Sequence, residues 1–194
     1  MKLSIDLAVD TKPAWVENIL ANFDTFLIDH ANCERKASAM AMSFVAKYPN
    51  RVEIIPLLIE TAVEELEHFQ KVYQIMEDRN IKLNDSMSED SYVRQLLELC
   101  RNGRDERFLD RLLLASVIEC RGAERFKLVY ENIEDEELKK FYHMLWAAEA
   151  KHGNIFVEMA TNYFDDDAIY ERLQYFTNEE AKIVDKLEIR AAMH

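Results

Sequence analysis

A short motif occurs twice in this chain: a glutamate followed three residues later by a histidine. Glu65 precedes His68, and Glu149 precedes His152, with the same spacing. If both segments are helical, residues three apart lie on one face, so the carboxylate and the imidazole can bind the same metal ion. Glutamate is abundant in this sequence, so two such pairs are weak evidence by themselves.

A further glutamate stands at a matching position in the first half of the chain. The midpoint between Glu34 and Glu65 falls in the break formed by residues 48–50, Tyr-Pro-Asn. If this break is the turn between two antiparallel helices, the two glutamates lie at equal height on neighbouring helices, about 22 Å from the turn. The first half then presents a glutamate on one helix and a glutamate and histidine on the next.

The second half repeats this arrangement. The midpoint between Glu119 and Glu149 falls in the acidic segment 133–136, which has the character of a turn and a helix start. Two such halves supply the carboxylate-rich ligand set that holds two iron or manganese ions in a helical bundle. Carboxylates suit hard cations, and imidazole suits iron. The candidate metal ligands are Glu34, Glu65, His68, Glu119, Glu149 and His152.

The alternative interpretation is that these glutamates are solvated and the histidines are ordinary core residues. The matched geometry of both halves favours the metal site. Glu124 competes with Glu119, because Cys33-Glu34-Arg35 resembles Ala123-Glu124-Arg125 locally. Equal height favours Glu119 without excluding Glu124.

Two other carboxylates and one histidine lie close to the candidate ligands in the sequence. Glu64 and Glu67 point about 100° or more away from Glu65, which is more typical of a solvated face. His30 precedes Glu34 by four residues and could support it, although an ordinary, partly buried histidine is the simpler expectation.

Small residues flank two of the candidate ligands. They are Ala31, Ala37, Ser38 and Ala41 around Glu34, and Ala115, Ser116, Gly122 and Ala123 around Glu119. Small side chains on a metal-facing stripe would leave room for substrate or oxygen. They would equally let two helices approach closely, and the sequence leaves both interpretations open.

The elements that must position these residues are long helices. Apolar residues at helical spacing predict helices over 15–47, 52–79, 106–131 and 137–163, and a final helix over 165–192. Pro56 is compatible with the second helix because it falls in the first turn. Residues 80–105 form a crossover, with the polar run 84–90, a short amphipathic stretch at 92–100 and a helix stop at Asn102-Gly103. The predicted fold is all-α, a four-helix bundle with one long crossover and an extra C-terminal helix.

The composition agrees with a single helical domain over residues 1–194. Only 3 Gly and 3 Pro occur, too few for the turns of a sandwich, barrel or propeller. The net charge of -13 repels nucleic acid on average, so a generally basic binding surface and a DNA partner are excluded. No apolar run approaches the roughly 20 residues of a membrane span.

The cysteines and the N-terminal residues predict a cytoplasmic protein. Cys33, Cys100 and Cys120 are odd in number and lack the paired spacing of a zinc site, so we expect reduced thiols. The first fifteen residues lack the basic start, apolar middle and cleavage site of a secretory signal.

Several stretches of the sequence resemble the MiaE family. They are Asn22 to Pro49 (NFDTFLIDHANCERKASAMAMSFVAKYP), Glu64 to Tyr73 (EELEHFQKVY), Arg107 to Phe126 (RFLDRLLLASVIECRGAERF), Glu149 to His152, and the terminal RAAMH. The resemblance covers nearly the whole chain, and it extends well beyond the glutamate and histidine pattern that many ferritin-like proteins share. It implies a ferritin-like fold and a diiron tRNA hydroxylase, with both irons bound by the six candidate ligands.

The resemblance also implies a reaction and its partners. The reaction is the oxygen-dependent hydroxylation of the isopentenyl group of 2-methylthio-N6-isopentenyladenosine, beside the anticodon of certain tRNAs. The partners are the tRNA and an electron-donor protein or reductase. The alternatives are a ferritin-type iron-oxidising or storage protein with the same ligands, and a metal-free helical interaction protein.

A tRNA partner requires a local cationic surface on this acidic chain. Arg104, Arg107 and Arg111 are spaced three and four apart on one predicted helix face, with Arg101 just before them. The competing interpretation is a solvated face on which they pair with Asp105, Glu106 and Asp110. Arg104, Arg107 and Arg111 are therefore candidate residues for binding the tRNA substrate.

Overall fold

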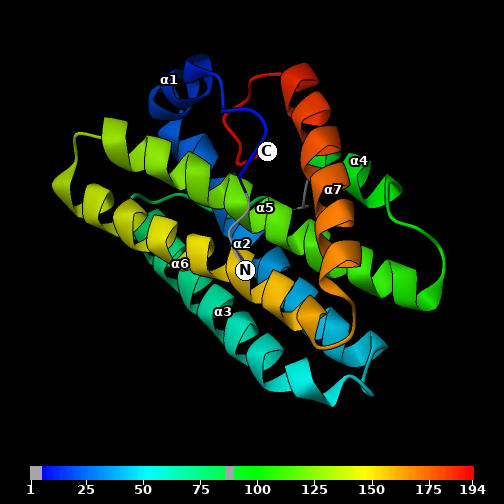
Figure 1. The fold of residues 1–194 in the computed structure, drawn as a ribbon. Helices are drawn as coiled ribbons and strands as arrows, with labels where there is room; N and C mark the ends of the chain where they lie inside the picture. Colours follow the sequence, from blue (N-terminus) through cyan, green and yellow to red (C-terminus); the bar gives the residue numbers. More distant parts are fainter. Residues whose placement is uncertain (1–5, 86–89) are drawn as a thin grey trace. The chain divides into compact units, whose positions relative to one another are not determined.

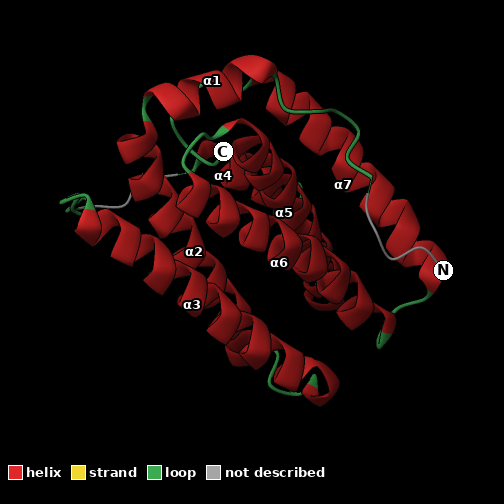
Figure 2. Ribbon diagram, turned by 90° about the vertical axis from the view of Figure 1, so that its left-hand side faces the viewer, coloured by secondary structure: helices red, strands yellow, loops and turns green. Residues whose placement is uncertain are grey.

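The computed structural model describes residues 6–85 and 90–194, which consist of helices and loops without strands (Figure 2). The residues outside it include the first five of the N-terminal segment and part of the predicted polar run, 86–89. Seven α-helices and one 3-10 turn occur in the described residues. The chain forms two compact units, and the first division between them along the chain falls inside α1 (Pro13–Ala21).

Among the described residues, the first unit comprises 6–17, 90–189 and 194, and the second comprises 18–85 and 190–193. The core of the second unit is an antiparallel helical hairpin (Figure 1). Its helices are α2 (Phe23–Lys47) and α3 (Ile55–Asp78), joined by a turn and by the short η1 (Val52–Ile54). Pro56 occupies the first turn of α3, where its missing N–H costs no hydrogen bond, as predicted.

The prediction of one unbroken helix over 15–47 is wrong. The chain leaves helical geometry at Asn22, with φ -132° and ψ 41°, so that α1 and α2 are separate helices. The Asn22 side-chain amide donates to the Asn18 carbonyl oxygen at 3.0 Å. An asparagine that bonds nearby backbone groups offers the chain an alternative to helical geometry, which explains a break without proline or glycine.

The first unit contains a second antiparallel hairpin, formed by α5 (Arg104–Asn132) and α6 (Glu136–Thr161). The two helices lie side by side in Figure 1. The predicted turn at 133–136 is confirmed: Asp135 caps α6 by accepting hydrogen bonds from the Glu137 and Leu138 backbone N–H groups, at 2.9 and 3.0 Å. A carboxylate at this position satisfies N–H groups that have no partner within the helix.

The crossover carries the short helix α4 (Ser91–Glu98), capped by Asp90. The final helix, α7 (Asp166–Lys186), starts where expected but ends six residues before the predicted end at 192. Leu187 is extended, with φ -65° and ψ 139°. Beyond it, His194 stacks on Tyr92 with ring centroids 4.5 Å apart. Such a contact with a distant residue outweighs the local helix propensity of the last residues.

Asp110 ties three segments of the first unit together. This completely buried carboxylate on α5 accepts hydrogen bonds from Arg101 in the crossover and from Arg172 on α7, each with a shortest distance of 2.8 Å. Burial by itself would raise the pKa of Asp110, but the hydrogen bonds from Arg172 and Arg101 outweigh it and lower the pKa below 3.8. The negative form of Asp110 is therefore the form that stabilises the fold.

We predict that Asp110→Asn lowers the free energy of unfolding by roughly 2–3 kcal/mol, because it leaves two arginines without their buried partner. Because the folded-state pKa is lowered, the contribution of Asp110 is present above its unfolded-state value and is lost as the pH falls through the lowered pKa. Urea denaturation over a pH series should show a full difference from wild type well above pH 3.8 and a shrinking one below it. The exposed Asp85→Asn serves as a control with no effect, and an unchanged stability of Asp110→Asn at neutral pH would refute the assignment.

Candidate metal centre

The second unit brings three of the candidate ligands together. Glu34 projects from α2, and Glu65 and His68 project from adjacent turns of α3. His68 Nδ1 lies 3.7 Å from Glu34 Oε2 and 3.6 Å from Glu65 Oε2. All three residues are buried, with 5% or less of their surface exposed. We call Glu34, Glu65 and His68 the second-unit triad.

A hydrogen bond across the hairpin explains why Glu34 and Glu65 meet. Ser38 Oγ on α2 donates to the Ala62 carbonyl oxygen on α3 at 2.7 Å. The midpoint between these two residues is Asn50, in the turn, so the helices have the register that the equal-height argument requires. Ser38 thus serves the close approach of the two helices.

His30 is more closely associated with the triad than the sequence suggested. It is completely buried, rather than partly buried as we expected, and its Nε2 lies 2.7 Å from Glu34 Oε1. Its ring also stacks on Phe26, with centroids 5.6 Å apart. One oxygen of Glu34 therefore faces His30 while the other faces His68. The spacing of four residues was the only sequence signal for this contact.

The first unit brings the other three candidate ligands together. Glu119 projects from α5, and Glu149 and His152 project from α6. Their ligand atoms lie within 4.8 Å of one another, and His152 Nδ1 is 3.2 Å from Glu149 Oε2. No more than 6% of any of the three is exposed. We call Glu119, Glu149 and His152 the first-unit triad.

The register of the α5–α6 hairpin is fixed in the same way. Ser116 Oγ on α5 donates to the Gly153 carbonyl oxygen on α6, and the midpoint of this pair also falls in the turn, between residues 134 and 135. A Cβ atom at Gly153 would lie 2.6 Å from Cys120 Sγ, so a larger residue here would have to displace the Cys120 side chain. At Ser38, Ser116 and Gly153, small residues therefore serve close helix packing.

Glu124, the alternative to Glu119, belongs to a different cluster. It accepts hydrogen bonds from the Thr11 backbone N–H at 2.8 Å, the Thr11 hydroxyl at 2.6 Å and the Arg121 guanidinium at 3.0 Å. Arg121 in turn forms an ion pair with Glu180 on α7, at 2.7 Å. On α3, Glu67 is exposed and Glu64 is partly exposed.

The two triads have the chemistry of a metal site. Burying an ionised carboxylate costs several kcal/mol unless a cation compensates it, and each triad buries two glutamates beside one histidine. Two carboxylates and one imidazole per triad are ligands suited to iron or manganese. The residues present therefore fit the proposed metal.

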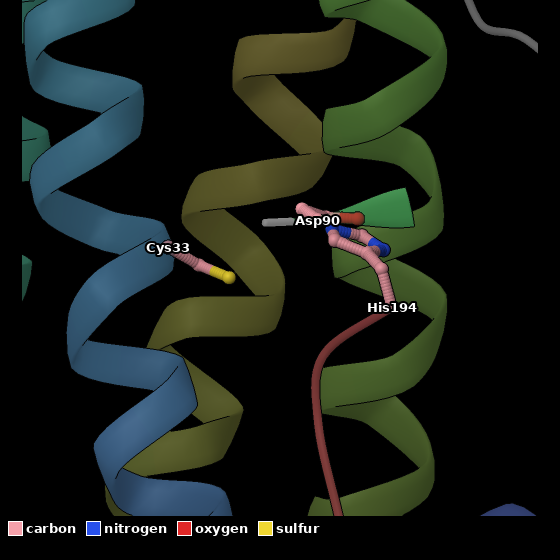
Figure 3. A group of neighbouring side chains, drawn as sticks. All are labelled: Cys33, Asp90 and His194. Carbon is pink, nitrogen blue, oxygen red and sulfur yellow. The ribbon is translucent and has the colours of Figure 1, made fainter. Parts of the chain in front are cut away.

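A second group of possible ligands lies in the first unit, where Asp90 and His194 approach one another (Figure 3). Asp90 caps α4 by accepting hydrogen bonds from the Tyr92 and Val93 backbone N–H groups, at 3.0 and 3.1 Å. Figure 3 also draws Cys33, which belongs to α2 of the second unit, where its thiol donates to Asp29. We assign no metal to this group. Cys33, Cys100 and Cys120 form no disulfide in the structure.

The candidate tRNA-binding arginines lie at the start of α5. Arg104 is exposed, Arg107 and Arg111 are partly buried, and Arg107 donates to the Arg101 carbonyl oxygen at 3.3 Å. The sequence suggests Asp110 as an ion-pair partner for these arginines on a solvated face. In the structure Asp110 is buried and binds Arg101 and Arg172 instead. None of the described helices has the length and apolar character needed to cross a membrane.

Comparison with known proteins identifies the family. The family model described as tRNA-(MS[2]IO[6]A)-hydroxylase (MiaE) matches residues 3–194. The tRNA 2-(methylsulfanyl)-N(6)-isopentenyladenosine(37) hydroxylase of Pseudomonas putida is 34% identical over 188 residues, which cover 97% of this chain and 91% of that protein. The Salmonella typhimurium hydroxylase of the same name is 30% identical over 132 residues, 68% of this chain and 48% of that protein.

A solved structure has the same fold. It is Protein 43 with aldehyde deformylating oxygenase activity from Synechococcus, which matches with a TM-score of 0.91 and 33% identity over 97% of this chain and 94% of that chain. This likeness and the buried glutamate and histidine clusters confirm the predicted all-α, ferritin-like fold. The family model and both hydroxylases agree on the family: this chain belongs to the MiaE family of tRNA hydroxylases.

Proposed function

We propose that this protein hydroxylates the isopentenyl group of 2-methylthio-N6-isopentenyladenosine beside the anticodon of tRNA, with two iron ions and molecular oxygen. The observation that carries the proposal is the pair of buried glutamate and histidine triads, one from each hairpin, in a chain of the MiaE family. The iron-storage alternative uses the same ligands, but the family match favours the hydroxylase.

The metal pair would be held by all six residues of the two triads: Glu34, Glu65, His68, Glu119, Glu149 and His152. When bound, the irons supply the activation of oxygen that the hydroxylation of a methyl C–H bond requires. One oxygen atom enters the product and the other leaves as water, so two electrons must come from an electron-donor protein or reductase. The placement of Glu124 against Thr11 and Arg121 supports Glu119 as the ligand on α5.

The chain contributes fixed ligand positions and the exclusion of water. His30 bonds one oxygen of Glu34 and so directs the other oxygen toward His68. Such partners of a metal-binding carboxylate orient it and tune its affinity. In the first unit, Gly153 lets α6 approach α5, which keeps Glu149 and His152 opposite Glu119. Burial of both triads protects reactive species from bulk water.

The remaining parts of the proposal concern the whole protein. We infer that residues 1–194 act as a single ferritin-like domain in the cytoplasm, where modified tRNA is present. The tRNA approaches a chain with a net charge of -13, so it needs a local cationic contact. Arg104, Arg107 and Arg111 at the start of α5 are the candidates for that contact.

The proposed reaction predicts a change in tRNA composition. Nucleoside mass spectrometry should find hydroxylated 2-methylthio-N6-isopentenyladenosine in cells that contain the protein, and only the unhydroxylated nucleoside in cells that lack it. The purified protein should convert one into the other with oxygen and a reductant. Identical nucleoside profiles with and without the protein would refute this function.

The proposed metal site predicts about two irons per chain, and a loss of most iron together with activity on His68→Ala or His152→Ala. Each substitution removes one imidazole ligand from one triad. Metal analysis after anaerobic iron loading measures the stoichiometry. Glu67→Ala, on an exposed position next to His68, is the matched control and should retain both irons. Full iron content in both histidine variants would exclude the six-ligand site.

The proposed docking site predicts a salt-dependent effect of the arginines. Replacing Arg104, Arg107 and Arg111 together by Gln should weaken tRNA binding and flatten its dependence on salt, because fewer counterions are released. Iron content and the helical circular dichroism signal should stay unchanged. If the variant binds tRNA with unaltered affinity and salt slope, the docking site lies elsewhere, with Lys36, Lys47 and Arg51 as the next candidates.

A further inference from the structure

Exposed apolar side chains are concentrated on one hairpin. Nine large apolar residues of the described chain are exposed, and six of them lie on α2, η1 and α3 of the second unit: Met42, Val52, Ile59, Val63, Leu66 and Tyr73. Leu66 and Val63 leave 55% and 50% of their surface in contact with solvent. None of the nine lies on α5 or α6, the corresponding hairpin of the first unit. Where such exposed residues form one patch, the patch is typical of an interaction site.

The exposed apolar residues of η1 and α3 repeat like those of a helix that packs against another helix. Ile59, Leu66 and Tyr73 of α3 are seven residues apart, Val63 stands between the first two, and Val52 of η1 precedes Ile59 by another seven residues. Apolar residues at this spacing form a narrow stripe that fits along a second helix. The stripe faces solvent, so no helix of the second unit fills that role.

The stripe adjoins exposed residues of α2. Because Ser38 bonds the Ala62 carbonyl oxygen, the helices face each other at these two positions. Met42 lies one turn after Ser38, and Ile59 lies one turn before Ala62, so both border the line where the helices meet. Ala39 and Ala46 of α2 are exposed as well. We call the surface of Met42, Ala39, Ala46 and the apolar stripe of η1 and α3 the hairpin face.

The two edges of the hairpin face carry opposite charges. Glu53 of η1 and Glu60 and Glu67 of α3 each follow a residue of the stripe and lie roughly half a turn from the contact with α2. The exposed Lys71 lies on the same edge, which therefore has three acidic side chains and one basic one. Lys36 and Lys47 lie half a turn around α2 from Ser38, on the opposite edge. In the antiparallel register, Lys47 stands at the height of Glu53, and Lys36 stands at a height between Glu60 and Glu67.

We propose that the hairpin face binds a second copy of this chain, with a two-fold axis parallel to the helices. This axis places α3 of each copy against α2 of the other, so that the acidic edge of each meets the basic edge of its partner at matching heights. A self-complementary face of this kind is what an isologous dimer requires. The three glutamates of the acidic edge disfavour a tRNA that covers the whole face, whereas Lys36 and Lys47 of the basic edge remain the second candidates for a tRNA contact.

The size of the hairpin face is sufficient for a dimer. A helix of 24 residues is about 36 Å long, and two adjacent helices make a face of roughly 700 Å². A stable interface of standard size covers about 800 Å² per partner. The charged edges select the second copy and the orientation, while the apolar stripe supplies most of the affinity.

Sedimentation analysis of the iron-loaded protein over a concentration series tests the proposal. The wild type should dimerise at or below about 100 µM. Val63→Glu, at the centre of the stripe, should be monomeric with unchanged iron content and helical signal, whereas Ile189→Glu, an exposed apolar residue outside the hairpin face, should dimerise like the wild type. A monomeric wild type, or a Val63→Glu protein that still dimerises, would overturn the proposal.

Charge exchange tests the orientation separately. The acidic-edge variant Glu53→Lys with Glu60→Lys and Glu67→Lys, and the basic-edge variant Lys36→Glu with Lys47→Glu, should each be mainly monomeric because like charges then face each other. Mixing the two variants should restore a dimer that native mass spectrometry identifies as containing one chain of each. A mixture that stays monomeric, or variants that dimerise alone, would overturn the proposed arrangement.

Discussion

The buried carboxylates impose the strictest physical constraint on this protein. Glu34, Glu65, Glu119 and Glu149 are each more than nine-tenths buried. An ionised carboxylate that is buried to this extent is stable only beside a cation or strong hydrogen-bond donors. Each triad includes one histidine, which is a ligand for a metal rather than a permanent positive charge. The proposed pair of metal ions would compensate the buried negative charge in both hairpins, and each hairpin offers the same set of side chains to bind them.

The constraint can be met only if each hairpin holds its register. A shift of one residue would turn a glutamate about 100° away from its partner helix. Two serine hydroxyls, Ser38 and Ser116, prevent such a shift by donating to carbonyl oxygens of the facing helix. Gly153 contributes in a different way, because its missing side chain lets the helices approach. Ser38, Ser116 and Gly153 thus have a structural role.

The first unit also contains buried charged residues that are not candidate metal ligands. Arg121 is completely buried and binds Glu180, and the ion pair raises the pKa of Arg121 although burial opposes it. Arg125 lies over the Trp15 ring at 5.0 Å, and burial lowers its pKa to about 10. Tyr92 donates to Glu180, and burial together with that carboxylate raises the pKa of its hydroxyl. These groups compensate one another, so they stabilise the fold around α5 without a cofactor.

The sequence by itself determined the features that depend on local spacing. Helical periodicity and two turns were sufficient to predict both hairpins, and residue counting around each turn brought Glu34 beside Glu65 and Glu119 beside Glu149. Tertiary structure decided the features that depend on residues far apart in the chain. Thr11 binds Glu124, and His194 stacks on Tyr92 after α7 has ended. The complete burial of His30 and the helix break at Asn22 were not predicted from the sequence. Helical periodicity indicates which face of a helix is apolar, but it does not indicate which polar group a neighbouring residue will bind.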